Sequence, residues 1–377
     1  MKKTLIAAAV VAGLAGVAQA ESSVTLYGIV DGGLAYTYSK GLKADNSYAG
    51  KGAKVKSFAV SQDGAAASRF GLKGQEDLGN GLNAIFQLEG GFNLATGASA
   101  SGEDLTKNGP LFARKAIIGL SGEGFGTLTA GRQNDVVDEL AKGDVFGGNF
   151  GDDYSAFGAL QGRSNSVVRY ISPDLAGLKL GLSWSGDHKK VTDAAGDVDK
   201  TKADKLAAIA TFDVDGLGLS AGYIYQRTND GSDRAVNKQY SLGLEYDFEV
   251  LKVFARFERQ KVEKADLKVV LGKVVSGGFL FGDVLGASEF KSYNYALGVA
   301  LPVSESGTVL AGWQYTTGKY NGNDDAVRYN LFRVGYAESL SKRTTAYVYG
   351  GYGYAKQNGL GHTPKLGTVS IGLNHKF

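Results

Sequence analysis

The sequence predicts an all-β fold, a closed transmembrane barrel of about sixteen antiparallel strands. The first observation is the strict alternation of apolar and polar residues, which is clearest in KLGTVSIGLNHKF at residues 365–377. The second is the spacing of connections, because short turns such as Asp215-Gly216 alternate with long polar stretches such as 134–162. The third is the composition, with 20 Tyr, 18 Phe and 56 Gly but only 4 Pro, so that few strands would lose a ladder hydrogen bond.

The first twenty residues form a separate unit. Lys2 and Lys3 precede an apolar stretch over residues 5–17, and the sequence AQA at 18–20 fits the A-x-A pattern of a cleavage site. This predicts a signal peptide over residues 1–20, Sec-type export and a barrel domain over residues 21–377, with an uncleaved anchor as the alternative. No later apolar run reaches the roughly 18 residues that a spanning helix needs, so only strands could cross a membrane.

The predicted strands have two different faces. They begin with residues 23–37 and 66–76 and end with 365–377, and the polar stretch at 40–56 is predicted to be a connection. The apolar residues at alternate positions of each strand would face lipid, and the polar residues between them would face a watery interior. Because hydrocarbon cannot satisfy an open sheet edge, the first and last strands must pair. A soluble β-sandwich also alternates, but the run YVYGGYGY at 347–354 suits a lipid interface better.

Composition argues against catalysis, metals and nucleic acid. The chain has no cysteine and only three histidines, at positions 188, 362 and 375. It therefore offers few residues for thiol chemistry, for a metal site or for a catalytic base. Without Lys2 and Lys3, 39 basic residues face 38 acidic ones, and this balance indicates no nucleic-acid partner. We therefore expect neither an enzyme nor a cofactor, and an outer-membrane hydrolase is the alternative that a lipid or peptide hydrolysis assay would test.

Five segments carry a resemblance to a known family. They are SSVTLYGIVDGGL at 22–34, SRFGLKGQEDLGNGLNAIFQLE at 68–89, ARKAIIGLSGEGFGTLTAGRQ at 113–133, NSVVRYISPDLAGL at 165–178 and the terminal GLNHKF. Together they resemble the general diffusion porins of Gram-negative outer membranes, in the branch typical of β-proteobacteria. The resemblance covers the whole chain after the leader.

The resemblance implies a function, partners and a location. It implies a homotrimer in the outer membrane that lets small ions and hydrophilic solutes diffuse passively, with a third extracellular loop folded into the pore. Outer-membrane lipid and lipopolysaccharide would surround it. The terminal Phe377 would be the signal that the barrel assembly machinery reads.

Residues 134–162 are the candidate for the inward loop, because a long insertion without secondary structure is usually functional. Against the single Lys142 this loop carries six acids, namely Asp135, Asp138, Glu139, Asp144, Asp152 and Asp153. The candidate wall bases are Arg69, Lys73 and Arg169 by strand parity, and Arg114 and Arg132 by resemblance alone.

Acids on the loop that face bases on the wall would set up a transverse field across the pore constriction. Because clustered guanidiniums stay charged while loop acids can pair with them, we expect a mild anion preference. Neutralising Arg69 together with Arg132 is then predicted to shift permeability toward cations. A substrate-specific outer-membrane channel and an adhesin are the remaining alternatives, and saturable block of conductance by one sugar would favour the specific channel.

Overall fold

The computed structural model describes ten stretches of the chain. They are residues 23–41, 52–62, 64–99, 110–147, 162–192, 198–229, 234–263, 289–320, 327–356 and 362–377. The signal peptide predicted over residues 1–20 lies outside these stretches and stays a prediction.

The described residues form one antiparallel sheet with a short helix on its inner side. The strands are β1 (Ser23–Lys40), β2 (Lys54–Gln62), β3 (Arg69–Gly79), β4 (Leu82–Gly91), β5 (Lys115–Gly122), β6 (Gly126–Asn134), β7 (Arg163–Ile171), β8 (Leu178–Thr192), β9 (Val198–Val214), β10 (Leu217–Asn229), β11 (Arg234–Asp247), β12 (Lys252–Glu263), β13 (Glu289–Pro302), β14 (Gly307–Tyr320), β15 (Val327–Ser339), β16 (Thr344–Lys356) and β17 (Lys365–Lys376), and the helix is α2 (Val136–Leu140). In the described part of the chain, no helix is both long and apolar enough to cross a membrane.

The sheet closes on itself. Residues 29–40 of β1 pair with residues 365–376 of β17, which joins the first strand to the last. The segments β2 and β3 share one position in the barrel, because residues 32–40 of β1 pair with β2 whereas residues 23–29 pair with β3. The seventeen segments therefore make sixteen barrel strands, and the predicted closed sixteen-stranded antiparallel barrel is confirmed.

The structure corrects the sequence prediction at the second barrel strand. That strand begins at Lys54, inside the stretch predicted to be a connection, and it is interrupted between β2 and β3. At the interruption the carboxylate of Asp31 accepts the amides of Gly64, Ala65 and Ala66 over 2.7–3.3 Å. Because these amides bond to a side chain inside the barrel, they cannot continue the ladder with β1.

Alternate side chains of each strand face opposite sides of the wall. On β17, Val369, Ile371 and Leu373 are 52–60% exposed, whereas Ser370 and Asn374 are 1% and 5% exposed. The exposed parity is apolar and the buried parity is polar, the reverse of a soluble protein. The apolar side chains therefore face lipid on the outside, and the polar side chains face the interior.

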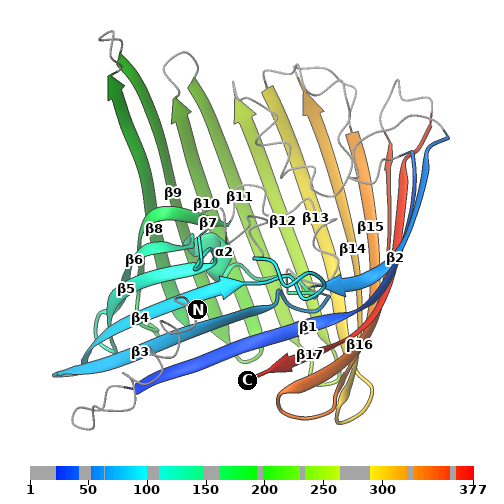
Figure 1. Ribbon diagram of the computed structural model, residues 1–377, viewed down its shortest axis with the longest axis horizontal. Helices are drawn as coiled ribbons and strands as arrows, with labels where there is room; N and C mark the ends of the chain where they lie inside the picture. Colours follow the sequence, from blue (N-terminus) through cyan, green and yellow to red (C-terminus); the bar gives the residue numbers. More distant parts are fainter. Residues whose placement is uncertain are drawn as a thin grey trace, which may run out of the picture.

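The barrel wall is unequal in height (Figure 1). The strands β9 to β15 rise well above β3 to β6, which lie low and slanted. Short turns lie at the end that carries the C-terminus. One of them joins β9 to β10 through Asp215 and Gly216, whose φ values of 45° and 80° suit a two-residue hairpin. In outer-membrane barrels the short turns face the periplasm and the longer connections face the cell exterior.

Candidate functional site

A segment that follows β6 lies inside the barrel. This inner segment (residues 134–147) starts with Asp135, whose carboxylate accepts the amides of Val137 at 3.0 Å and Asp138 at 2.9 Å. Asp135 therefore caps α2, since it satisfies amides that a helix start leaves open. The helix contacts β8, β9 and β10 on the face that carries their buried polar side chains.

Two valines fix α2 against the wall. Val136 and Val137 are fully buried. They pack in one cluster with wall side chains of β9 and β10, namely Ala207, Ile209 and Ile224. Gly222 gives Val137 room, because a Cβ at that position would lie 3.0 Å from the valine side chain. The helix thus covers apolar residues on the inner face of β9 and β10.

The inner segment continues along the wall after the helix. The amide of Lys142 donates to Ser220 Oγ on β10 at 3.1 Å, and the following amide donates to Glu245 Oε1 on β11 at 3.1 Å. Phe146 then packs with Tyr347 of β16. The segment therefore crosses the inner face from β8 to β16. It forms the first part of the inward loop predicted over residues 134–162.

Three acids of the inner segment are paired with bases on the wall. Asp135 Oδ2 lies 2.5 Å from Lys205 Nζ, and Glu139 Oε2 lies 3.2 Å from Arg169 Nη1. Further contacts join Glu139 to Lys115 at 3.9 Å and Asp144 to Arg333 at 3.8 Å. Each pair cancels much of the field that the acid would otherwise impose on the lumen.

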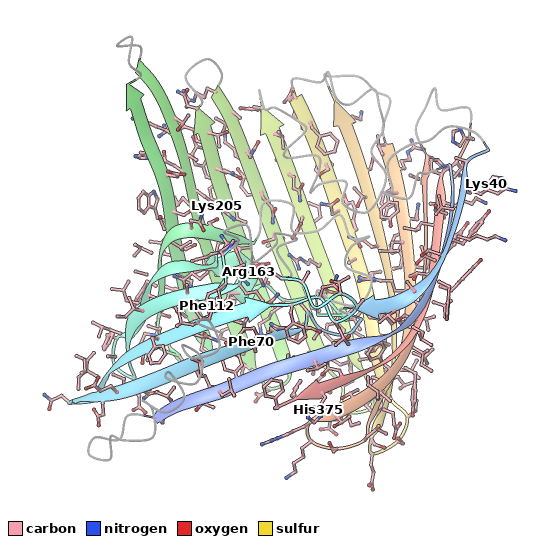
Figure 2. All side chains as sticks on the ribbon, in the orientation of Figure 1. Lys40, Phe70, Phe112, Arg163, Lys205 and His375 are labelled. Carbon is pink, nitrogen blue, oxygen red and sulfur yellow. The ribbon has the colours of Figure 1, made fainter. Side chains whose placement is uncertain are left out.

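Asp138 differs from the other acids of α2. Asp138 is exposed to the lumen, but the protein packed around the inner segment on all sides, and then the charge of Asp135, raise the pKa of Asp138 to about 6. Arg163 and Lys205 on the wall oppose the shift, and Glu139 adds to it. Figure 2 shows Arg163 and Lys205 close to the helix. Asp138 is therefore a lumen charge that titrates near neutral pH.

Acidification is expected to make the lumen more positive. The carboxylate of Asp138 is charged well above its pKa of about 6 and neutral well below it. Lowering the pH from about 7.5 to about 5 should thus increase the permeability ratio of anions to cations, measured from zero-current potentials, by roughly 1.5-fold. Asp138→Asn should show the low-pH ratio at both values. An equal pH response in this variant would assign the titration to another group.

A cluster of basic side chains surrounds one carboxylate on the wall formed by β3, β4 and β5, and extends through Arg163 toward α2. Arg114 Nε lies 2.7 Å from Glu89 Oε1, and Arg69 Nη1 lies 3.9 Å from the same oxygen. Tyr27 donates its hydroxyl to Glu89 Oε2 at 2.9 Å. Arg163 is near enough to interact electrostatically with Arg69, Arg114 and Glu89. The arginine cluster (Arg69, Arg114 and Arg163) therefore sets three positive charges against one negative charge.

The sequence analysis missed Arg163. It stands at the start of β7, directly after the acidic loop, where it pairs with Asn134. A register shift between Arg163 and Val167 interrupts the alternation, so the parity of the buried Val167 and Arg169 gave no signal for this residue. Lys205 and Arg333 were missed as well, although each lies on the polar parity of its strand.

Arg132 does not join the cluster. In the β5–β6 ladder it pairs with Ala116, on the parity that carries the exposed Ile118 and Leu120. Its guanidinium donates to Asn165 Oδ1 at 2.6 Å and to a backbone carbonyl. In the β5–β6 ladder this arginine is thus on the outward parity, beside an irregularity in the β6–β7 register, and its place on the constriction wall stays a prediction from the resemblance.

The other predicted residues have different places. Lys73 lies on the inner parity of β3, with its Nζ 5.7 Å from the centre of the Tyr27 ring. Asp152 and Asp153 lie outside the described residues. Phe377 follows β17 at the periplasmic end, and its ring is 44% exposed on the outer face.

The chain matches a family model over residues 7–360, and the model describes Gram-negative porins. The chain is a Gram-negative porin. This porin is 36% identical to an outer membrane porin protein of Bordetella pertussis, with all of both chains covered. It is 31% identical to outer membrane porin protein 32 of Delftia acidovorans, over 92% of this chain and 88% of the relative.

Solved structures have the same fold as this porin. The anion-selective porin from Comamonas acidovorans matches with a TM-score of 0.67 and 25% identity, over 95% of this chain and all of that one. The outer membrane channel DcaP of Acinetobacter baumannii matches with a TM-score of 0.64 at 15% identity, over 94% of this chain and 97% of that one. The porin is therefore a multi-pass β-barrel protein of the outer membrane.

Proposed function

We propose that this porin is a water-filled channel for passive diffusion of small ions and hydrophilic solutes, with a mild preference for anions. The arginine cluster is the observation that carries the sign, since Arg69 and Arg114 are both paired with Glu89 and Arg163 adds a third guanidinium, which interacts with Asp138 and Glu89. Guanidiniums stay charged at any accessible pH. The acids of the inner segment are largely paired with wall bases. The name of the Comamonas neighbour agrees with this sign.

The proposed constriction of the pore lies between the inner segment and the arginine cluster. The segment would narrow the lumen, and the low dielectric of its walls would focus the field of the cluster on a passing ion. The six loop acids and the wall bases named from sequence contribute to this field to different extents. Asp138 is proposed as the acid that most opposes the cluster, because the described part of the chain gives it no ion pair.

Neutralising two members of the cluster should weaken anion preference. For Arg69→Gln with Arg163→Gln, we expect the anion-to-cation permeability ratio to fall by about threefold in dilute salt. The measurement is the zero-current potential of planar bilayers under a salt gradient. The difference should shrink near 1 M salt, where the Debye length is roughly 3 Å.

Arg132→Gln is the matched control, because it removes the same charge from the outer face. It should leave the permeability ratio unchanged. A shift in this control, or none in the double variant, would contradict the assignment of the cluster. Saturable block of the current by one sugar would instead favour a substrate-specific channel.

The low wall supports a homotrimer. Strands β5, β6 and β7 have 8, 9 and 9 residues. Eight residues at about 3.4 Å each, tilted by about 45°, rise roughly 19 Å, less than the apolar band of about 25 Å. Backbone ends that fall short of the band need protein cover. We place the neighbouring subunits of the trimer against this wall, which exposes Ile118 of β5 and Leu128 of β6.

Ile118→Ser should dissociate the oligomer. Ile118 is 68% exposed on the low wall, whereas Leu242 is 55% exposed on the tall wall, away from the proposed interface. Most of the Ile118 variant is expected to be monomeric by light scattering in mild detergent, while Leu242→Ser stays trimeric. Equal trimer content in the two variants would contradict this placement of the interface.

The proposal also covers export and assembly. Cleavage after residue 20 would release a barrel domain over residues 21–377. Phe377 would present the end of β17 to the barrel assembly machinery, and lipopolysaccharide would contact the outer surface.

A further inference from the structure

One hairpin on the periplasmic side differs in charge from all the others. Six of the seven short hairpin connections carry an acid, namely Asp77, Glu123, Asp174, Asp215, Glu249 and Glu305. The seventh, between β15 and β16, carries Lys342 and Arg343. Both side chains are exposed, and neither has an ion pair within the described part of the chain. This basic turn (residues 341–343) is therefore the exception on a rim that is otherwise acidic.

The surroundings of the basic turn keep a net positive charge. Lys376 at the end of β17 lies beside the turn, because its amide donates to the carbonyl of Arg343 at 2.8 Å. One acidic side chain, Glu338, belongs to the same hairpin, and it accepts the hydroxyls of Ser306 and Tyr336. Three basic side chains thus stand against one acidic side chain on this flank of the low wall.

The other flank of the low wall carries the opposite charge. Glu76 shares the outward parity of Phe70 on β3, and Glu123 lies in the turn between β5 and β6. Both glutamates are exposed, and neither has an ion pair within the described ranges. Asp77 adds a third negative charge, although its carboxylate accepts the amide of Gly79 in its own turn at 2.7 Å. We call these three residues the acidic flank.

The basic turn and the acidic flank are too far apart to pair within one barrel. Arg343 neighbours Lys376, Lys376 pairs with Ile29, and Ile29 pairs with Arg69. Glu76 lies seven residues beyond Arg69 along β3, or roughly 24 Å at about 3.4 Å per residue. Screening at physiological salt acts over about 8 Å. Neither charge can therefore balance the other in the same subunit.

A threefold ring brings these two regions of different subunits together. In a closed ring each subunit presents two different patches, one to each neighbour. Figure 1 shows the turn between β3 and β4 at one end of the low wall and the C-terminus toward the other end. With the low wall toward the axis, as in the proposed trimer, the basic turn of one subunit comes beside the acidic flank of the next.

We propose that Lys342 and Arg343 of one subunit form ion pairs with Glu76 and Glu123 of the neighbouring subunit, at the periplasmic end of the trimer interface. This assignment rests on the homotrimer of the proposed function and names the side chains through which a second copy of the chain is recognised. The apolar low wall supplies most of the contact area. The ion pairs select which flank each subunit offers, because complementary charges steer association and like charges oppose it.

Charge reversal tests this contact. The acid-reversed chain carries Glu76→Lys with Glu123→Lys, and the base-reversed chain carries Lys342→Glu with Arg343→Glu. Each should lower the temperature at which trimers dissociate into monomers by about 10 °C, because like charges then meet at every contact of the ring. The measurement is the proportion of trimer on gels after stepwise heating, checked by light scattering in mild detergent. The combined chain with all four changes restores opposite charges and should dissociate close to the wild-type temperature.

Mixing the two reversed chains distinguishes contacts between subunits from contacts within one. In a mixed trimer two of the three contacts join opposite charges, whereas every contact in a trimer of either chain alone joins like charges. Refolding the two chains together should give at least about threefold more trimer than refolding either chain alone. A mixture no better than its components, or a combined chain no better than the reversed chains, would overturn the proposal. The acids would then have another partner, such as a divalent cation at the lipid surface.

Glu305→Lys is the matched control. It reverses an exposed acid in the turn between β13 and β14, on the tall wall away from the proposed interface. Its dissociation temperature should equal that of the wild type. The effects of the two reversed chains should shrink near 1 M salt, where the Debye length is roughly 3 Å. A shift in the control, or effects that persist in high salt, would show that the substitutions disturb the turns themselves, against the proposal.

The oligomeric state of the wild type separates this inference from the proposed function. A wild type that is monomeric in mild detergent would contradict the proposed trimer and the ion pairs with it. A trimeric wild type whose dissociation temperature is matched by both reversed chains would contradict only the ion pairs. Trimers of the combined chain should keep the wild-type ion preference, because none of the four side chains belongs to the arginine cluster.

Discussion

Deleting Phe377, or replacing it with aspartate, is expected to lower the amount of assembled oligomer in the outer membrane by about tenfold. Deletion removes the last closing bonds of the sheet, and aspartate puts a charge in place of an outward aromatic ring. The Phe377 amide donates to the Gly28 carbonyl at 3.1 Å, and the Gly28 amide donates to the Phe377 carbonyl at 3.0 Å. These two bonds are the last of the β1–β17 seam. The phenyl ring covers Gly28, where a Cβ would lie 2.3 Å from it.

The measurement is the fraction of heat-modifiable oligomer in outer-membrane preparations, normalised to total chain. Phe377→Tyr keeps the ring and both backbone bonds, so it should assemble nearly as well as the wild type. Lys376→Gln, beside it, tests whether any change at the terminus is harmful, and it should assemble normally. Equal oligomer from the aspartate variant and the wild type would exclude a role of the aromatic terminus in assembly. The single-channel conductance of any barrels that do assemble should be unchanged.

The alternation of apolar and polar residues was sufficient to predict the closed barrel. It failed at β2, and the reason is the chemistry of the outer face. Along that parity Lys54 and Lys56 stand at headgroup level, and Phe58 and Val60 follow in the apolar band. One outward face thus changes from basic to apolar within four residues. A search for alternating hydrophobicity therefore detects only the lower half of the second barrel strand, which is β3.

The candidate site was predicted in part, because strand parity gives the face of a side chain but not its partner. Parity put Arg69 and Lys73 inside, where Arg69 contacts Glu89 and Lys73 lies over the Tyr27 ring, whereas their part in the constriction stays a prediction. For Arg132 the resemblance supplied the position, whereas parity was ambiguous, because Leu128 and Ala130 on the same parity could equally face lipid and are both exposed. The pairing of Glu139 with Arg169 joins segments thirty residues apart, and no local pattern encodes it.

Replacing Asp31 with alanine should destabilise the barrel by on the order of 5 kcal/mol, since several buried donors would lose their acceptor at once. Besides three backbone amides of residues 64–66, the carboxylate accepts the Tyr347 hydroxyl at 2.9 Å and the Asn374 side-chain amide at 2.8 Å. Asp31 is fully buried. It therefore holds the interrupted second strand, β16 and β17 together beside the seam that closes the barrel.

Loss of this carboxylate should also reach the lumen. Ala65 and Tyr347 pack in one cluster with Phe146, at the far end of the inner segment. We expect Asp31→Ala to show more open-channel current noise than the wild type, because the end of the segment would lose its fixed support. The stability change can be measured from the urea dependence of the heat-modifiable gel shift.

Tyr347→Phe is the graded control for Asp31. It removes one donor and keeps the ring, so the expected loss is only about 1 kcal/mol, the usual net contribution of one hydrogen bond. Asp31→Asn should fall between the two variants, because its amide group can accept through one oxygen but presents two further donors to a site already filled with donors. A urea midpoint for Asp31→Ala equal to that of Tyr347→Phe would mean that the backbone ladder alone closes the seam. The interruption between β2 and β3 would then have no role in stability.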